Sequence, residues 1–258
     1  MTVKLKEGES PIPAQRIVVV TGGSAGIGQA CVIQLVESGH QVIALGRREP
    51  RLRELVARCG ANKVHALFCD VRDRQSLRQA LAGLPSLFSK PDTLINNAGL
   101  MLGNGLFEDL HDEDIDTMVA TNCIGVLNAT SALLSRLSES GRGHILNITS
   151  IASSYPYVGG HVYAGTKAFV EHFGACLRTE LVDRHIKVTN LSPGRTETEF
   201  NIVRSHGISN EVEKGTAKTQ SLTADDVARA VCWAIAQPAH VNINSIEIVP
   251  SRQSLSFR

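Results

Sequence analysis

Short runs of apolar residues alternate along this chain with longer stretches in which apolar and polar positions mix at helical spacing. Each run is rich in Val, Ile or Leu, which is typical of buried strands. The runs are RIVVVTG (16–22), QVIALG (41–46), KVHALFCD (63–70), DTLINNAG (92–99), GHILNITS (143–150), IKVTNLSPG (186–194) and NSIEIV (244–249). The mixed stretches predict helices at 27–38, 73–83, within 111–138, at 161–183 and at 223–236.

Strands that alternate with helices and lack hairpin turns indicate a parallel sheet covered on both faces. The sequence therefore predicts an α/β fold, a single doubly wound Rossmann-type domain with a parallel sheet of about seven strands. We expect this domain to span 15–258, preceded by a flexible N-terminal arm at 1–14. The irregular stretch 195–222 is long for a connection, so we expect a substrate lid that contains short helices.

Composition and charge exclude several classes of protein. The chain has 258 residues, 43% of them hydrophobic, which suffices for one large core. Its 26 basic and 25 acidic residues nearly cancel, so nucleic acid and anionic membranes are not expected partners. The N-terminus is polar, no apolar run approaches the ~18 residues of a membrane span, and the six cysteines are scattered without a metal-like cluster. These features predict a cytoplasmic protein without a bound metal.

A glycine-rich loop, TGGSAGIG (21–28), lies between the first predicted strand and the first helix. Gly22, Gly26 and Gly28 allow a sharp turn, a close approach to an anion and tight packing of the helix on the strand. The N–H groups at the helix start suit a pyrophosphate. The alternative is a tight turn that binds nothing.

The second strand ends in ALGRR, which bears on the choice of cofactor. Folds that bind NAD usually place an acid about 20 residues after the glycines, to hold the ribose 2′-hydroxyl. Here Arg47 and Arg48 follow Gly46, and guanidinium groups favour a 2′-phosphate and hence NADP. The alternative is that both arginines are surface charges at the next helix start, which is an unfavourable position for cations.

The segment YAGTK (163–167) places a phenol and an amine one helical turn apart. Taken alone, Tyr163 and Lys167 could be a core tyrosine beside a solvated lysine. Further motifs are NNAG (96–99), TNCIG (121–125), ITS (148–150) and SPG (192–194), and Ser150 lies 13 residues before Tyr163. In this order and spacing the chain resembles the short-chain dehydrogenase/reductase family from about 15 to 250.

The resemblance implies hydride transfer with a nicotinamide cofactor and a catalytic set of four residues. Tyr163 would be the general acid or base, and the Lys167 cation would lower its pKa and hold the ribose. Ser150 would bind the substrate oxygen, and Asn122 would anchor a water that relays protons. Simpler roles for these two are a strand-end cap and a helix kink. With the glycine loop and the arginines, the expected NADP contacts are Gly22, Ser24, Ala25, Gly26, Ile27, Gly28, Arg47, Arg48, Asp70, Val71, Asn97, Ala98, Gly99, Tyr163, Lys167, Pro193, Gly194, Thr196 and Thr198.

More narrowly, GRREPRLREL, TETEFNIVRSHG, ADDVARAV and QPAHVNIN resemble the NADP-dependent 3-hydroxy acid and serine dehydrogenase branch. Arg195 and Thr196 depart from the apolar residues usual after Pro-Gly. The branch implies a small-molecule substrate, and Arg204, which lies in one of these stretches, is our candidate for binding its carboxylate; the alternative is that Arg204 pairs with a lid glutamate and only orders the loop. His161 is a further candidate contact, with a structural role at a helix start as its alternative. Alternative functions are a broad-specificity carbonyl or 3-oxoacyl thioester reductase, or a non-catalytic NADP-sensing regulator. The family usually assembles through its two long central helices, so we expect a homotetramer.

Overall fold

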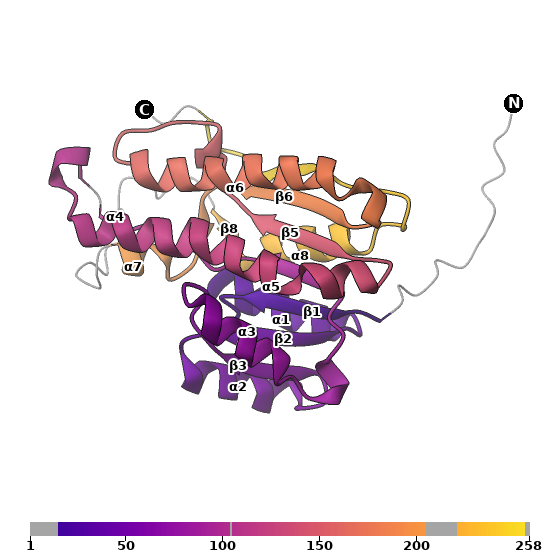
Figure 1. The fold of residues 1–258 in the computed structure, drawn as a ribbon. Helices are drawn as coiled ribbons and strands as arrows, with labels where there is room; N and C mark the ends of the chain where they lie inside the picture. Colours follow the sequence, from indigo (N-terminus) through magenta and orange to yellow (C-terminus); the bar gives the residue numbers. More distant parts are fainter. Residues whose placement is uncertain (1–14, 104, 205–220, 256–258) are drawn as a thin grey trace, which may run out of the picture.

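A seven-stranded parallel sheet forms the centre of the molecule, in a computed structural model that describes residues 15–103, 105–204 and 221–255 (Figure 1). The strand order is β3-β2-β1-β4-β5-β6-β9, and every neighbouring pair is parallel. The seven predicted strands are thereby confirmed. Their bounds are β1 Ile17–Thr21, β2 Gln41–Gly46, β3 Val64–Phe68, β4 Thr93–Asn96, β5 His144–Ile148, β6 Lys187–Pro193 and β9 Ser245–Ile248.

Helices cover both faces of the sheet, as the doubly wound fold requires (Figure 1). On one face pack α1 (Gly26–Glu37), α2 (Glu49–Cys59) and α8 (Ala224–Ile235). On the other pack α3 (Arg74–Ala82), α5 (Gly125–Glu139) and α6 (His161–Glu180). The helix predicted at 161–183 ends at Glu180, three residues before its predicted end. The sequence pattern did not predict bounds for the charged helix α2. Single 3-10 turns lie at Ser86–Phe88, Phe107–Asp109, Ile151–Ser153 and Val182–Arg184.

The long helix expected within 111–138 is interrupted. It consists of α4 (Asp112–Val119), a π turn (Ala120–Ile124) and α5. The whole stretch is long and apolar enough to cross a membrane, but 56% of its most apolar window is buried inside the fold, as in a core helix. π turns recur at functional sites, and this one carries Asn122.

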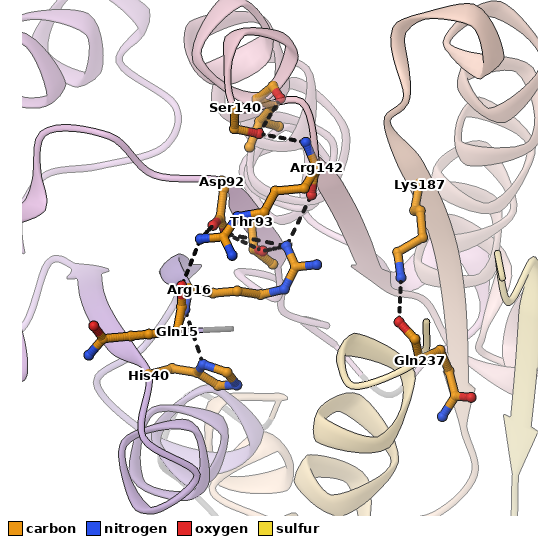
Figure 2. Close-up of polar contacts among 10 residues, drawn as sticks. Gln15, Arg16, His40, Asp92, Thr93, Ser140, Arg142, Lys187 and Gln237 are labelled. Carbon is orange, nitrogen blue, oxygen red and sulfur yellow. Dashed lines mark hydrogen bonds and ion pairs between the residues drawn. The ribbon is translucent and has the colours of Figure 1, made fainter. Parts of the chain in front are cut away.

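A polar cluster fastens the amino edge of the sheet, opposite the edge where the site lies (Figure 2). Asp92, just before β4, is almost fully buried and pairs with Arg16 at 3.4 Å and with Arg142 at 2.6 Å. The backbone N–H of Arg16 also donates to Nδ1 of His40, just before β2. One buried carboxylate thus ties the starts of β1, β4 and β5 together, because each cation precedes one of these strands.

The predicted lid is described in part. Residues 196–204, which we call the strap, contain the short strand β7 (Thr196–Glu197) and the helix α7 (Phe200–Arg204). β7 pairs in parallel with β8 (Leu222–Thr223) just before α8. A short helix in this region was predicted and is confirmed. The rest of the lid, 205–220, and the N-terminal arm, 1–14, lie outside the described residues.

Candidate active site

A cavity of about 860 Å³ opens at the carboxyl edge of the sheet, where the strand order reverses between β1 and β4. Doubly wound sheets bind their ligands at this position. Its walls include most residues predicted from the sequence: Gly22, Ser24, Ala25, Gly26, Ile27, Arg47, Arg48, Asp70, Val71, Asn97, Ala98, Gly99, Ser150, Tyr163, Lys167, Pro193, Gly194, Thr196, Thr198 and Arg204. Arg195 lines it as well.

The glycine loop fits a bound pyrophosphate. Gly22 and Gly26 have φ values of +69° and +52°, which glycine adopts readily. Helix α1 starts at Gly26, and its N-cap residue Ala25 has no side chain that could accept from the first N–H groups. Gly28 was predicted to contact the cofactor, but it does not line the cavity. A Cβ there would lie 2.3 Å from the Gly22 carbonyl oxygen, so Gly28 lets α1 pack against the loop.

Arginine side chains surround the cavity end next to β2. Nε of Arg48 donates to Oγ of Ser24 at 3.3 Å, and Nη1 of Arg47 lies 3.6 Å from Oδ2 of Asp70. Both guanidinium groups are about half exposed and line the cavity. Arg48 is also the N-cap residue of α2. The alternative prediction, that the arginines lie at the start of the next helix, is therefore correct for Arg48 as well. This end of the cavity therefore presents cations to a ligand.

The helix that carries Tyr163 and Lys167 is fixed on the sheet by an asparagine ladder. Nδ2 of Asn96 donates to Oδ1 of Asn147, and Nδ2 of Asn147 donates to Oδ1 of Asn190, both at 2.9 Å. Nδ2 of Asn190 then donates to the backbone oxygen of Glu171 in α6 at 2.7 Å. A Cβ at Gly174 would lie 2.2 Å from Oδ1 of Asn190, so only glycine lets α6 approach so closely.

The tyrosine, the lysine and Ser150 form a buried group. Burial raises the pKa of the Tyr163 hydroxyl above its ordinary value, while a hydrogen bond with Ser150 and the charge of Arg204 act in the opposite direction. Burial lowers the pKa of Lys167 to about 8. Nζ of Lys167 donates to the Ile148 carbonyl oxygen at 2.8 Å and lies 5.9 Å from the centre of the tyrosine ring. The resemblance implied a lowered pKa for Tyr163, but here desolvation outweighs the favourable charges and raises it.

Ser150 and Asn122 show how each candidate also has a structural role. Oγ of Ser150 accepts from the backbone N–H of Ala152 at 3.1 Å, so this residue does cap a turn. The side-chain amide of Asn122 is almost fully buried and does not line the cavity. Its Nδ2 donates to the Leu100 carbonyl oxygen and to Oγ1 of Thr166, and its Oδ1 accepts from the Leu100 N–H. Asn122 therefore joins the loop after β4 to the YAGTK helix.

The two predicted substrate contacts lie in different places. Arg204 lines the cavity, and its Nε donates to the Gly103 carbonyl oxygen at 3.2 Å. His161 lies outside the cavity lining. Its ring packs edge-on against Phe107, with 5.4 Å between ring centres. The structure thus brings Arg204, but not His161, to the site.

Sequence reasoning missed several residues at this site. Phe200 packs against Tyr163 with 5.5 Å between ring centres, and Tyr157 also lines the cavity. Glu199 lines it too and pairs with Arg48 and with Arg51, a residue of α2. An acid within a mixed-charge loop gives no sequence signal for such a partner. The segment TETEF offered one hint, since it belongs to the stretches that resemble the 3-hydroxy acid branch.

Comparisons with known proteins agree with this geometry. The family model described as short chain dehydrogenase matches residues 16–208. Serine 3-dehydrogenase of Rhizobium radiobacter is 42% identical over 93% of this chain and 95% of its own length. NADP-dependent 3-hydroxy acid dehydrogenase YdfG of Escherichia coli K12 is 44% identical over 92% and 96%.

A solved structure described as the closed form of serine dehydrogenase complexed with NADP⁺ superposes with a TM-score of 0.89 at 44% identity. The superposition includes 92% of this chain and 96% of the solved chain. The match extends over most of the chain. It therefore includes the Rossmann-type fold, the glycine loop and the Ser150–Tyr163–Lys167 group. The chain belongs to the short chain dehydrogenase family.

Proposed function

We propose that this protein is an NADP-dependent oxidoreductase that interconverts a hydroxyl and a carbonyl group. The observation that carries the proposal is the buried group of Ser150, Tyr163 and Lys167 at the inner end of a cavity whose outer end is lined with arginines. The relatives named for NADP-dependent 3-hydroxy acid and serine dehydrogenation support the cofactor and the reaction class.

The chain's own residues handle the proton and the substrate oxygen. A bound nicotinamide cofactor supplies or accepts the hydride. The raised pKa keeps the Tyr163 hydroxyl protonated at neutral pH, which is the form that donates to the carbonyl oxygen in reduction. Ser150 would hold the same oxygen, and Lys167 would hold ribose hydroxyls. Oxidation uses the same residues in reverse and starts from the deprotonated form of Tyr163, which then accepts the proton.

We further propose small 3-hydroxy acids as substrates, with Arg204 binding the carboxylate. Its charge acts on the pKa values of both Tyr157 and Tyr163, so the guanidinium lies near the reacting end of the cavity. The Gly103 carbonyl oxygen holds Nε and leaves the remaining guanidinium donors for a carboxylate. A cation close to the general acid suits a substrate whose carboxylate lies near its hydroxyl group.

Replacing Arg204 with Ala should raise KM for a 3-hydroxy acid by about ten- to a hundredfold, because a charge-assisted contact contributes roughly 1.5–3 kcal/mol. KM for an uncharged ketone of similar size should change little. Initial rates with both substrates, followed by NADPH absorbance, measure this difference. Arg204→Lys should recover part of the loss, since it restores the charge without the planar fork.

The matched control is Arg252→Ala, which removes another cation from the cavity wall. It should leave both KM values nearly unchanged. If Arg204→Ala affects the two substrates equally, Arg204 only orders the strap through Gly103. If the wild-type protein ignores 3-hydroxy acids and reduces bulky ketones well, the substrate proposal is wrong and the carbonyl reductase alternative is favoured.

We also propose a cytoplasmic homotetramer. Apolar side chains are exposed along the two long helices: Val119 and Ile124 by 40% and 39%, and Phe169 by 41%. Phe169 stacks on Phe173 in α6, which extends this apolar surface. Exposed apolar patches of this kind favour association. Light scattering at micromolar protein should give four times the mass of the chain, and a monomer mass would reject the proposal.

All six cysteines are free, which fits the reducing conditions of the cytoplasm.

A further inference from the structure

The strap crosses the cofactor cavity and is held at three points along its length. Near its start, Thr198 lies against the glycine loop, where a Cβ on Gly26 would come within 3.4 Å of it. In the middle, the Phe200 ring packs on Tyr163. At its end, the backbone oxygen of Arg204 accepts from the N–H of Gly103 at 3.1 Å. Moving the strap would therefore disturb the general acid as well as the cofactor cavity.

Glu199, an acid of the strap, forms two ion pairs that reach the far end of the cavity. Its Oε2 lies 3.0 Å from Nη1 of Arg48, and Nη1 of Arg51 donates to Oε1 and Oε2 at 2.8 and 2.7 Å. Hydrogen bonds from Arg51 hold the pKa of this carboxyl below its ordinary value, so it is charged at neutral pH. The contact joins the segment after β6 to α2, across the sheet's point of reversal.

The two arginines differ in their relation to the cavity. Arg48 lines it and is one of the residues expected to meet the 2′-phosphate, whereas Arg51 lies outside its lining. Each guanidinium has five N–H donors, and Glu199 occupies one nitrogen of each. Arg48 therefore keeps donors for a phosphate while Arg51 holds the carboxylate. Arg47, which also pairs with Asp70, adds a third cation beside them.

We propose that Glu199 is a positioning residue that latches the strap closed over the bound dinucleotide by pairing with Arg51 and Arg48. The inference rests on the proposed dinucleotide cofactor and extends it. The strap lies against the glycine loop, which both NADH and NADPH would contact, and not only beside the 2′-phosphate that NADPH alone carries. The latch therefore retains either nicotinamide dinucleotide. The latch sets how long the cofactor stays bound, and it keeps Phe200 against Tyr163.

The test is the rate at which Glu199→Gln releases cofactor, measured by stopped-flow fluorescence when bound NADPH or NADH is chased with excess NADP⁺. Both cofactors should leave about three- to tenfold faster than from the wild-type protein, since partly exposed ion pairs contribute modestly. The association rates should stay unchanged. In protein without cofactor, hydrogen exchange of the Phe200–Arg204 amides should also become faster.

Glu197→Gln is the matched control, because Glu197 is an exposed acid two residues away on the same strap. It should leave all of these rates unchanged. Arg51→Gln should speed release in part, because Arg48 still pairs with Glu199, and the double variant should release cofactor no faster than Glu199→Gln alone. That non-additivity identifies the pair rather than a general loosening.

Two results would overturn the latch. If Glu199→Gln binds NADPH more tightly and leaves NADH unchanged, the carboxylate competes with the 2′-phosphate instead of closing the strap. If release rates and hydrogen exchange stay as in the wild type, the ion pairs have no effect on the strap. Failure of the wild-type protein to bind NADPH at all would instead reject the proposed function, so the two failures can be told apart.

Discussion

Tyr163→Phe should lose nearly all turnover while binding NADPH as tightly as the wild-type protein. The substitution removes one oxygen from a ring that stays packed against Phe200, so the fold and the cavity should persist. Only the proton donor beside Ser150 and Lys167 disappears. General acid or base catalysis typically contributes about 10²- to 10⁴-fold, which sets the scale of the expected fall in kcat. Initial rates and fluorescence titration of NADPH measure the two quantities separately.

Tyr157→Phe is the matched control, because Tyr157 also lines the cavity and its hydroxyl lies 3.5 Å from Sδ of Met101. It should keep kcat within a few-fold of the wild type. A Tyr163→Phe variant that retains more than about a tenth of kcat, a barrier change below ~1.4 kcal/mol, would exclude Tyr163 as the general acid or base. Intact NADPH binding without any turnover in the wild-type protein would favour the regulator alternative.

Replacing Arg47 and Arg48 together with Ala should weaken NADPH at least tenfold and leave NADH nearly unchanged. Both side chains line the cavity beside Ser24 and Asp70, where a 2′-phosphate would lie. Each charge-assisted contact contributes roughly 1.5–3 kcal/mol, so the loss can exceed tenfold. Arg51 remains to hold Glu199, so the strap should stay in place for NADH.

Titration of both cofactors measures the ratio of affinities. Arg53→Ala/Arg58→Ala is a control of equal charge loss on helix α2, which follows directly, and neither residue lines the cavity. The control should shift neither affinity beyond the small effect of net charge. Equal losses for NADPH and NADH in the Arg47/Arg48 variant would mean that these arginines do not read the phosphate.

The sequence predicted those features of the fold that depend on local pattern. Parallel strands that are buried on both faces are continuous apolar runs, so each of the seven could be located. The glycine loop could be located because Gly22 and Gly26 adopt backbone conformations that favour glycine. Helix α2 was harder, since only Leu52 and Leu55 are buried in it and the rest is largely charged.

Features that depend on distant contacts could not be predicted. The π turn carries Asn122, whose amide bonds to Leu100 and Thr166, and its neighbours along the chain do not indicate these contacts. The pairing of Glu199 with Arg51 spans 148 positions of sequence. The Tyr163 pKa was predicted to fall, because a motif names the charged neighbour but says nothing of the burial that raises the value.

The buried amine of Lys167 also bears on how firmly the whole protein holds together. Its pKa is about 8 in the fold against an ordinary 10.5, so between these values the unfolded chain binds more protons. The free energy of unfolding therefore increases as the pH rises through this window. Below about pH 8 the amine is charged in the folded protein as well, and the full cost of burying that charge lowers the stability. The gap corresponds to roughly 3 kcal/mol, a large share of the usual ~5–15 kcal/mol margin of a domain. The group that the chemistry needs is thus one that makes this protein easier to melt at neutral pH.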